Sequence, residues 1–318
     1  MSPAMALQSP VFLFYLALAA GLLVCAGVVL AVLKWGLRRN VGHAWTAYCG
    51  WLFMVPLLLL VFFLGREAVI IFLTLVAIVG FQEFARATGL SHDWISTGVV
   101  HLGISATGVV CFMTDPTDGA PGWYGLFMAL PVFVIAMILV VPVARNRAQG
   151  QLKLLALAVV GFVYFGWMFG HLAFLANSAS AYSYLGYLVV AVELNDVAAY
   201  TWGKAFGRHL LRDNISPKKT WEGAVGALAV SLLLPWAMLF TFAHFDVWDC
   251  LLAGLIVGIG GQLGDLIVSV IKRDLGIKDM GTMIPGHGGI LDRIDSLIYV
   301  APLFFHCIRY RHGLNLSP

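Results

Sequence analysis

The sequence predicts an all-α integral membrane protein with about nine to ten transmembrane helices. Of its 318 residues, 61% are hydrophobic and only 11% are charged, whereas soluble domains carry roughly 25% charged residues. The mean hydropathy is +0.90. Apolar runs that approach the roughly 20 residues needed to cross a bilayer recur along the whole chain. This composition leaves no room for a separate soluble domain.

Ten apolar runs are candidate transmembrane helices. The charges near the first run follow it, at Lys34, Arg38 and Arg39, which is typical of an uncleaved first span rather than a cleaved signal peptide. The approximate limits of the ten runs are 11–33, 47–64, 68–85, 97–114, 122–143, 154–176, 182–202, 221–243, 249–271 and 290–308.

The basic residues predict the orientation of these spans. Cytoplasmic loops carry an excess of Lys and Arg, and here the basic loops alternate with loops that carry almost none. Both termini are therefore expected outside, in a multi-pass protein of the cell (inner) membrane. Arg309 and Arg311 are the exception, because they follow the last span. The basic loops are 34–39, 86, 145–153, 204–219 and 272–293, and the others are 66–67, 115–121, 177–181 and 244–249.

Several function classes are disfavoured by composition. The net charge of +3 and the lack of a basic tail argue against a nucleic-acid partner. The five cysteines form no C-x-x-C motif and lie mostly in apolar runs, where cysteine behaves as a small hydrophobe. Neither a disulfide framework nor a zinc site is expected.

The glycines of the run 249–271 have two interpretations. Gly254/Gly258 and Gly260/Gly264 could belong to a nucleotide-binding loop, but no strand precedes them. Their G-x-x-x-G spacing is typical of closely packed membrane helices, which is the interpretation the sequence favours. A P-loop is excluded because its motif is absent.

Acidic residues inside apolar runs mark a candidate site. Glu193 and Asp196 lie in one run and Asp265 in another, and Asp292 and Asp295 begin the last. A charge inside a membrane span is costly and is by default a functional hypothesis. The rise of a helix places Asp196 and Asp265 at a similar depth, roughly 10–12 Å below the basic loops that follow them.

These acids also have two interpretations. Oxygen ligands without His or Cys suit a hard cation such as Mg²⁺. Alternatively, each acid forms a structural ion pair, for instance Asp292 with Arg273. The basic loops on the same face favour the first, because a metal and basic groups together would neutralise phosphate oxygens. The basic residues of these two loops are Lys204, Arg208, Arg212, Lys218, Lys219, Lys272, Arg273, Lys278 and Arg293.

Three further groups of residues follow recognisable patterns. Asn-Asp-x-x-Ala-Tyr and Gly-Lys-x-x-Gly-Arg occur between 195 and 208, Ser-Pro-Lys-Lys-Thr-x-Glu-Gly spans 216–223, and Gly-Asp lies at 264–265. A longer signature runs Ser-x-x-Lys-Arg, four residues, Lys-Asp, and later Pro-x-His-Gly-Gly-x-x-Asp-Arg-x-Asp. Its residues are Ser269, Lys272, Arg273, Lys278, Asp279, Pro285, His287, Gly288, Gly289, Asp292, Arg293 and Asp295.

With these motifs the sequence resembles the phosphatidate cytidylyltransferase (CDP-diacylglycerol synthase) family. The resemblance is detailed over 193–297, whereas 1–180 matches only as a bundle of spans. It implies that CTP and phosphatidate react, with Mg²⁺ as the cofactor, to give CDP-diacylglycerol and diphosphate for phospholipid biosynthesis. Because the lipid phosphate is already an anionic nucleophile, no Ser or Cys nucleophile is expected. It also implies an N-terminal transmembrane region, 1–180, and a catalytic region, 181–318, with a polar site facing the cytoplasm.

The resemblance assigns roles to individual residues. The expected metal ligands are Asp265, Asp292 and Asp196, for Mg²⁺ alone or for Mg²⁺ together with a second cation. The expected catalytic residues are Asp265, Lys272, Arg273, Asp292, Arg293 and His287. The expected CTP and phosphate contacts are Asn195, Lys204, Ser216, Lys218, Lys219, Thr220, Ser269 and Lys278.

Two other functions remain open on sequence alone. A CTP-dependent polyprenol or lipid kinase would share the topology and the nucleotide but not the full signature. A membrane transporter would also need acids in its spans, but it predicts broken helices in both halves, and here the charge gathers in the C-terminal half. A homodimer in the lipid bilayer is expected.

Overall fold

The computed structural model describes residues 1–39, 41–242, 244–284 and 288–313. Each of the ten predicted spans coincides with helical structure in it. The first five spans are α2 (Pro10–Ala31) with the π-helical turn η1 (Val32–Gly36), α3 (Gly42–Leu64), α4 (Arg66–Thr88), α5 (Trp94–Phe112) and α6 (Tyr124–Ala144). The other five are α7–η3–α8 (Gln151–Gly161, Phe162–Met168, Gly170–Leu175), α9 (Ala181–Phe206), α10 (Trp221–Ala237), α11 (Val247–Asp274) and α12 (Leu291–His312).

The prediction of a multi-pass, all-α membrane protein is confirmed. Within the described ranges, seven helical segments are long and apolar enough to cross a membrane. Helices α9, α10 and α12 fall outside that set. Helix α10 has only 17 residues, and α9 and α12 carry the charged residues of the candidate site.

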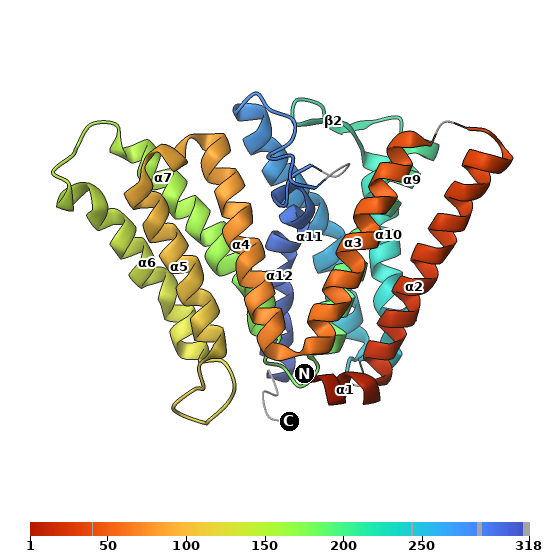
Figure 1. Ribbon diagram of the computed structural model, residues 1–318, viewed down its shortest axis with the longest axis horizontal. Helices are drawn as coiled ribbons and strands as arrows, with labels where there is room; N and C mark the ends of the chain where they lie inside the picture. The colour runs from red at the N-terminus through yellow and green to blue at the C-terminus, as the bar shows by residue number, and fades with distance from the viewer. Residues whose placement is uncertain (40, 243, 285–287, 314–318) are drawn as a thin grey trace.

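The helices run up and down between two ends of the molecule (Figure 1). The five loops predicted to be cytoplasmic, including the connections α6–α7, α9–α10 and α11–α12, all lie at the upper end in this view. The N-terminus and the C-terminal end of α12 lie at the lower end. The alternation of basic loops thus agrees with the arrangement of the helices, and the side of the membrane on which each end lies stays a prediction, as does the homodimer.

The glycines of α11 allow close packing on two sides, as their spacing predicted. A Cβ atom at Gly254 would lie 2.7 Å from the backbone of Leu232 in α10. A Cβ atom at Gly264 would lie 2.8 Å from the carbonyl oxygen of Asp295 in α12. Small residues let the backbones of membrane helices approach in this way, and α11 is thereby fixed between α10 and α12.

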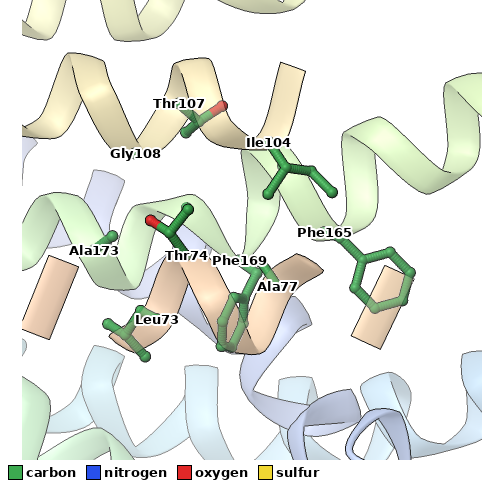
Figure 2. Close-up of a pocket in the computed structure, with 11 residues that line it drawn as sticks. Leu73, Thr74, Ala77, Ile104, Thr107, Gly108, Phe165, Phe169 and Ala173 are labelled. Carbon is green, nitrogen blue, oxygen red and sulfur yellow. The ribbon is translucent and has the colours of Figure 1, made fainter. Parts of the chain in front are cut away.

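Helices of the N-terminal half also pack closely at glycine residues. Figure 2 shows where α4, α5 and the η3–α8 segment meet around a cavity of about 10 Å³. Gly108 lies against Thr74 there, and the hydroxyls of Thr74 and Thr107 donate to carbonyl oxygens of their own helices. This void has room for about one water molecule, so it is a packing gap and not a substrate site.

Two features of the fold were not predicted. The loop after α9 contains an antiparallel hairpin of β1 (Leu210–Arg212) and β2 (Ser216–Thr220), which pairs Leu210 with Thr220. Thr220 ends the hairpin and caps α10, because its hydroxyl accepts a hydrogen bond from Gly223 N. The predicted span 154–176 is also interrupted by the π-helical turn η3. Three short helices complete the chain: α1 (Pro3–Gln8), η2 (Leu90–His92) and η4 (Leu239–Thr241).

Candidate active site

The hairpin brings one lysine onto the helices of the candidate site. Lys219 Nζ lies 2.6 Å from Asp265 Oδ2 of α11 and donates a 3.1 Å hydrogen bond to Gln262 Oε1, one turn earlier. Its neighbour Lys218 is exposed. Successive side chains of a strand point to opposite faces, so only one of the two predicted lysines can face the site.

A buried amide network fixes the helices under this ion pair. Gln262 Nε2 donates to Asn195 Oδ1 of α9 at 2.7 Å, and Asn195 Nδ2 donates to Ser231 Oγ of α10 at 2.9 Å. Asn195 is fully buried. The amide of Asn195 is therefore engaged in helix–helix contacts, whereas the sequence predicts a substrate contact for it.

Asp292 organises the loop that carries the long signature. Its Oδ1 accepts from Lys272 Nζ at 3.0 Å, and its Oδ2 accepts from the backbone N–H groups of Met280 and Gly289, also at 3.0 Å. The side chain is only 6% exposed. The alternative prediction, an ion pair between Asp292 and Arg273, is wrong. Asp292 pairs with Lys272, and Arg273 Nε donates to the carbonyl of Ile215.

Two further carboxylates, those of Asp196 and Asp295, lie near Asp265. Asp295 of α12 is close enough to Asp265 and Asp196 for their charges to repel, and Arg293 is close enough to attract Asp196. Asp295 is buried, and Oδ1 accepts from the N–H of Ser296. This group of acids is where the sequence predicts a metal ion.

The donor set fits Mg²⁺ in particular. In the described part of the chain, no three His, Cys, Asp or Glu side chains form a ready metal cage. Mg²⁺ is usually held by one or two carboxylates together with water and substrate phosphates rather than by a cage of protein ligands. The carboxylates of Asp265 and Asp196, with Asp295 near them, are ligands of this kind, and Asp292 is linked to Asp265 through Lys272, which interacts with both.

The remaining predicted residues lie around this centre in different environments. Ser269 donates to Asp265 Oδ1 at 3.3 Å, and Thr220 is the cap of α10. Lys204, Lys278 and Arg293 are exposed, and Ser216 begins β2. His287 lies outside the described residues.

Sequence reasoning missed a carboxylate from the N-terminal half. Glu83 of α4 is buried, and its two oxygens accept from the N–H groups of Ile290 and Leu291 at 3.1 and 2.9 Å. A Cβ atom at Gly281 or at Gly289 would lie 2.5 Å from this carboxylate. These glycines are thus required for space, and Glu83 ties α4 to the signature loop. The signal was present, because Glu83 is an acid within the predicted span 68–85.

A tyrosine of the N-terminal half also reaches the site. Tyr164 of η3 is close enough to Asp295 and Asp265 to interact with their charges. Among the described residues its buried hydroxyl has no hydrogen-bond partner. Nothing in the sequence of this aromatic-rich span indicates that Tyr164 lies near these two acids.

Comparisons with known proteins agree with this arrangement. The model of the cytidylyltransferase family matches residues 45–311. The phosphatidate cytidylyltransferase of Staphylococcus haemolyticus (strain JCSC1435) is 34% identical over 262 residues, which cover 81% of this chain and 95% of the relative. That of Staphylococcus aureus (strain COL) is 35% identical over 261 residues, with the same coverage. The uncharacterised protein YnbB of Escherichia coli (strain K12) is 46% identical over 124 residues, 39% of this chain and 42% of the relative.

The family match covers most of the chain, and it includes both the polar ends of α9, α11 and α12 and the helix that carries Glu83. The chain therefore belongs to the cytidylyltransferase family and is a nucleotidyltransferase.

Proposed function

We propose that this enzyme joins CTP and phosphatidate to give CDP-diacylglycerol and diphosphate. The observation that carries the proposal is the group of carboxylates on α9, α11 and α12, set beside Lys219 and Lys272 at the end of the bundle where the motif loops lie. Two relatives named phosphatidate cytidylyltransferase, each matched over 95% of its length, support the choice of lipid.

The proposed reaction is an in-line displacement at phosphorus. A phosphate oxygen of the lipid forms a bond to the α-phosphorus of CTP, the bond from that phosphorus to the bridging oxygen breaks, and diphosphate leaves. The lipid phosphate is already an anionic nucleophile, so no Ser or Cys nucleophile is required. The main task of the protein is to hold two anions in line and neutralise their charge.

Two lysines are suited to this task. Lys219 and Lys272 already contact carboxylates, at 2.6 and 3.0 Å, and their side chains are only 19% and 11% exposed. Their ammonium groups can transfer from a carboxylate to a phosphate oxygen without a large movement. A partly buried cation acts strongly on phosphate charge because little water screens it.

Mg²⁺ is proposed as the cofactor, held by Asp265 and Asp292 with Asp196 next to them. When bound, it would supply further neutralisation of the triphosphate and of the leaving diphosphate. Asp292 would then share its oxygens between that cation and the loop contacts described above.

We also propose that the site faces the cytoplasm. The basic loops gather at the same end as the site, and such loops are retained on the cytoplasmic side. CTP would reach the site from that side, and the acyl chains would stay in the bilayer.

One assay tests the reaction against both alternatives. Purified enzyme with phosphatidate and Mg²⁺ receives CTP labelled either at the α- or at the γ-phosphorus. The proposal expects lipid labelled from the α-position only, with diphosphate released. A lipid kinase would label its lipid from the γ-position, and a transporter would label none; either result would overturn the proposal.

A further inference from the structure

A second cavity, of about 500 Å³, borders the signature loop. It is bounded by α4 between Ile78 and Arg86, by His101 of α5 and by residues 280–283 of the loop. Pockets for small ligands span roughly 300–1,000 Å³, so this cavity is large enough for a headgroup and the adjoining carbons. The roles assigned above leave it unused.

The polarity of this cavity changes along α4. Ile78 and Val79 line one part, and Gln82 and Arg86 follow them one and two turns later on the same face. Arg86 lies roughly 12 Å beyond Ile78 along the helix, towards the end where the motif loops lie. The cavity thus has an apolar part deeper in the bundle and a cationic part at the loop end.

The apolar part continues onto the outer surface of the bundle. Ile71 and Leu75 precede Ile78 on the same side of α4, and they are 52% and 55% exposed. In a membrane protein such exposed side chains contact lipid chains. A molecule in the cavity can therefore keep its hydrocarbon in the bilayer.

The cationic part has charge available for an anion. Arg86 is exposed, and none of the ion pairs among the described residues involves it. His101 Nδ1 donates to the carbonyl of Thr97 at 2.9 Å, so Nε2 can donate to an anion when the imidazole is protonated. Glu83 also borders the cavity, but its carboxylate is engaged by the N–H groups at the start of α12.

We propose that this cavity binds the lipid substrate, with its phosphate monoester at Arg86, Gln82 and His101 and its acyl chains along Ile78 and Val79. The inference rests on the proposed function for the identity of the lipid. The loop segment connects the two sites, because Met280 lines the cavity while its N–H bonds Asp292, the partner of Lys272. Lipid and nucleotide would thus both lie against the segment that positions Asp292 and Lys272.

Direct binding of a short-chain phosphatidate, dioctanoyl phosphatidate, to purified enzyme without CTP tests the inference. The variants are Arg86→Gln, which removes the charge, and Val79→Trp, which fills the apolar part. Lys153→Gln is the matched control, because Lys153 is an exposed basic residue at the start of α7, outside the cavity. Glycerol 3-phosphate and dioctanoylglycerol, which each carry one half of the ligand, are the comparison ligands.

We expect both cavity variants to lose at least tenfold in affinity for dioctanoyl phosphatidate and to raise its KM to the same extent. Lys153→Gln should stay within twofold, the KM for CTP should be unchanged in all three, and each half-ligand should bind weakly. Unchanged lipid binding in Arg86→Gln, or a raised KM for CTP in place of the lipid, would overturn the inference. Because Val79→Trp can disturb folding, Arg86→Gln alone decides the result if the melting temperature of Val79→Trp falls.

The failure of this inference differs from a failure of the proposed function. If wild-type enzyme makes CDP-diacylglycerol and Arg86→Gln binds lipid normally, the function stands and the cavity assignment is wrong. If phosphatidate binds through Arg86 but no α-label reaches lipid, the cavity assignment stands and the reaction is wrong.

Discussion

The helix pair α11–α12 carries a charged cluster at each end, and the two clusters differ in charge balance. At the lower end, Arg311 contacts both Asp246 and Asp249, and His312 lies 2.8 Å from Asp249. Asp246 and Asp249 also accept each other's backbone N–H groups in a capping box. Every carboxylate of the lower cluster therefore has a cation and a backbone donor.

The upper cluster has no such balance. Asp265 and Asp292 each have a lysine, but Asp196 and Asp295 add carboxylates that repel Asp265. The lower cluster holds two helices together, and the upper cluster is where we propose that a cation and a substrate bind. Counting charges along the sequence does not separate these cases, since both clusters contain acids and bases on the same two helices.

The lower cluster also explains an exception in the basic loops. Arg311 follows the last span on the side where few basic residues were expected. Its guanidinium is used locally, as the counter-ion of the two acids that begin α11. A basic residue bound in this way is a structural contact and a weak signal of orientation.

The largest expected effect is at the upper cluster. Asp265→Asn should lower turnover at least a hundredfold, about 2.7 kcal/mol of barrier, because it removes a charge that binds the cation and orients Lys219. The protein should still fold, and EDTA should silence the wild type. Turnover is measured with labelled CTP at saturating Mg²⁺. Near-normal turnover there would remove the functional distinction between the two clusters.

The two lysines of β2 should behave differently. Lys219→Ala should lower kcat/KM for CTP about thirtyfold, roughly 2 kcal/mol, because it removes the cation beside Asp265. Lys218→Ala is the matched control and should stay within threefold, because its side chain faces away from the site. Titration of CTP at fixed lipid in detergent measures both. Equal losses of kcat/KM in the two variants would show that the opposite orientation of neighbouring side chains in β2 does not determine which lysine contributes to the reaction.

A change at the lower cluster should affect stability and leave activity intact. Arg311→Gln should lower the free energy of unfolding by about 1.5 kcal/mol, because Asp249 loses a charged hydrogen bond. The value of kcat/KM should stay within twofold at temperatures where the protein is folded. Thermal unfolding in detergent, with activity measured in parallel, checks both. A loss of activity without a loss of stability would place the lower cluster in the catalytic machinery.

The sequence was sufficient to predict the helices, because hydropathy and basic loops respond directly to the bilayer. It also assigned Asp265, Asp292 and Lys272 to one site, and in the structure Lys272 contacts Asp292 and lies near Asp265, while their roles stay predictions. It could not predict which partner each acid takes. Lys219 reaches Asp265 only through the β1–β2 hairpin, and Lys272 takes the place expected for Arg273 beside Asp292. The ion-pair partner of each acid depends on the geometry of the turns and on the length of the side chains.

The most instructive omission is Glu83, a buried acid whose partners are backbone N–H groups and not cations. We expect Glu83→Gln to lower kcat about tenfold, roughly 1.4 kcal/mol, because an amide NH₂ group would face one of the two N–H donors at the start of α12. The KM for CTP should change little, and amide hydrogen exchange at 280–284 and 288–291 should become faster. Glu67→Gln is the matched control, since Glu67 is an exposed acid at the other end of α4. A drop in stability with unchanged exchange in the loop and unchanged kcat would make Glu83 a packing residue only. Slower turnover with faster exchange would show that the N-terminal half holds the signature loop in its active position, although it contributes no residue to the motifs.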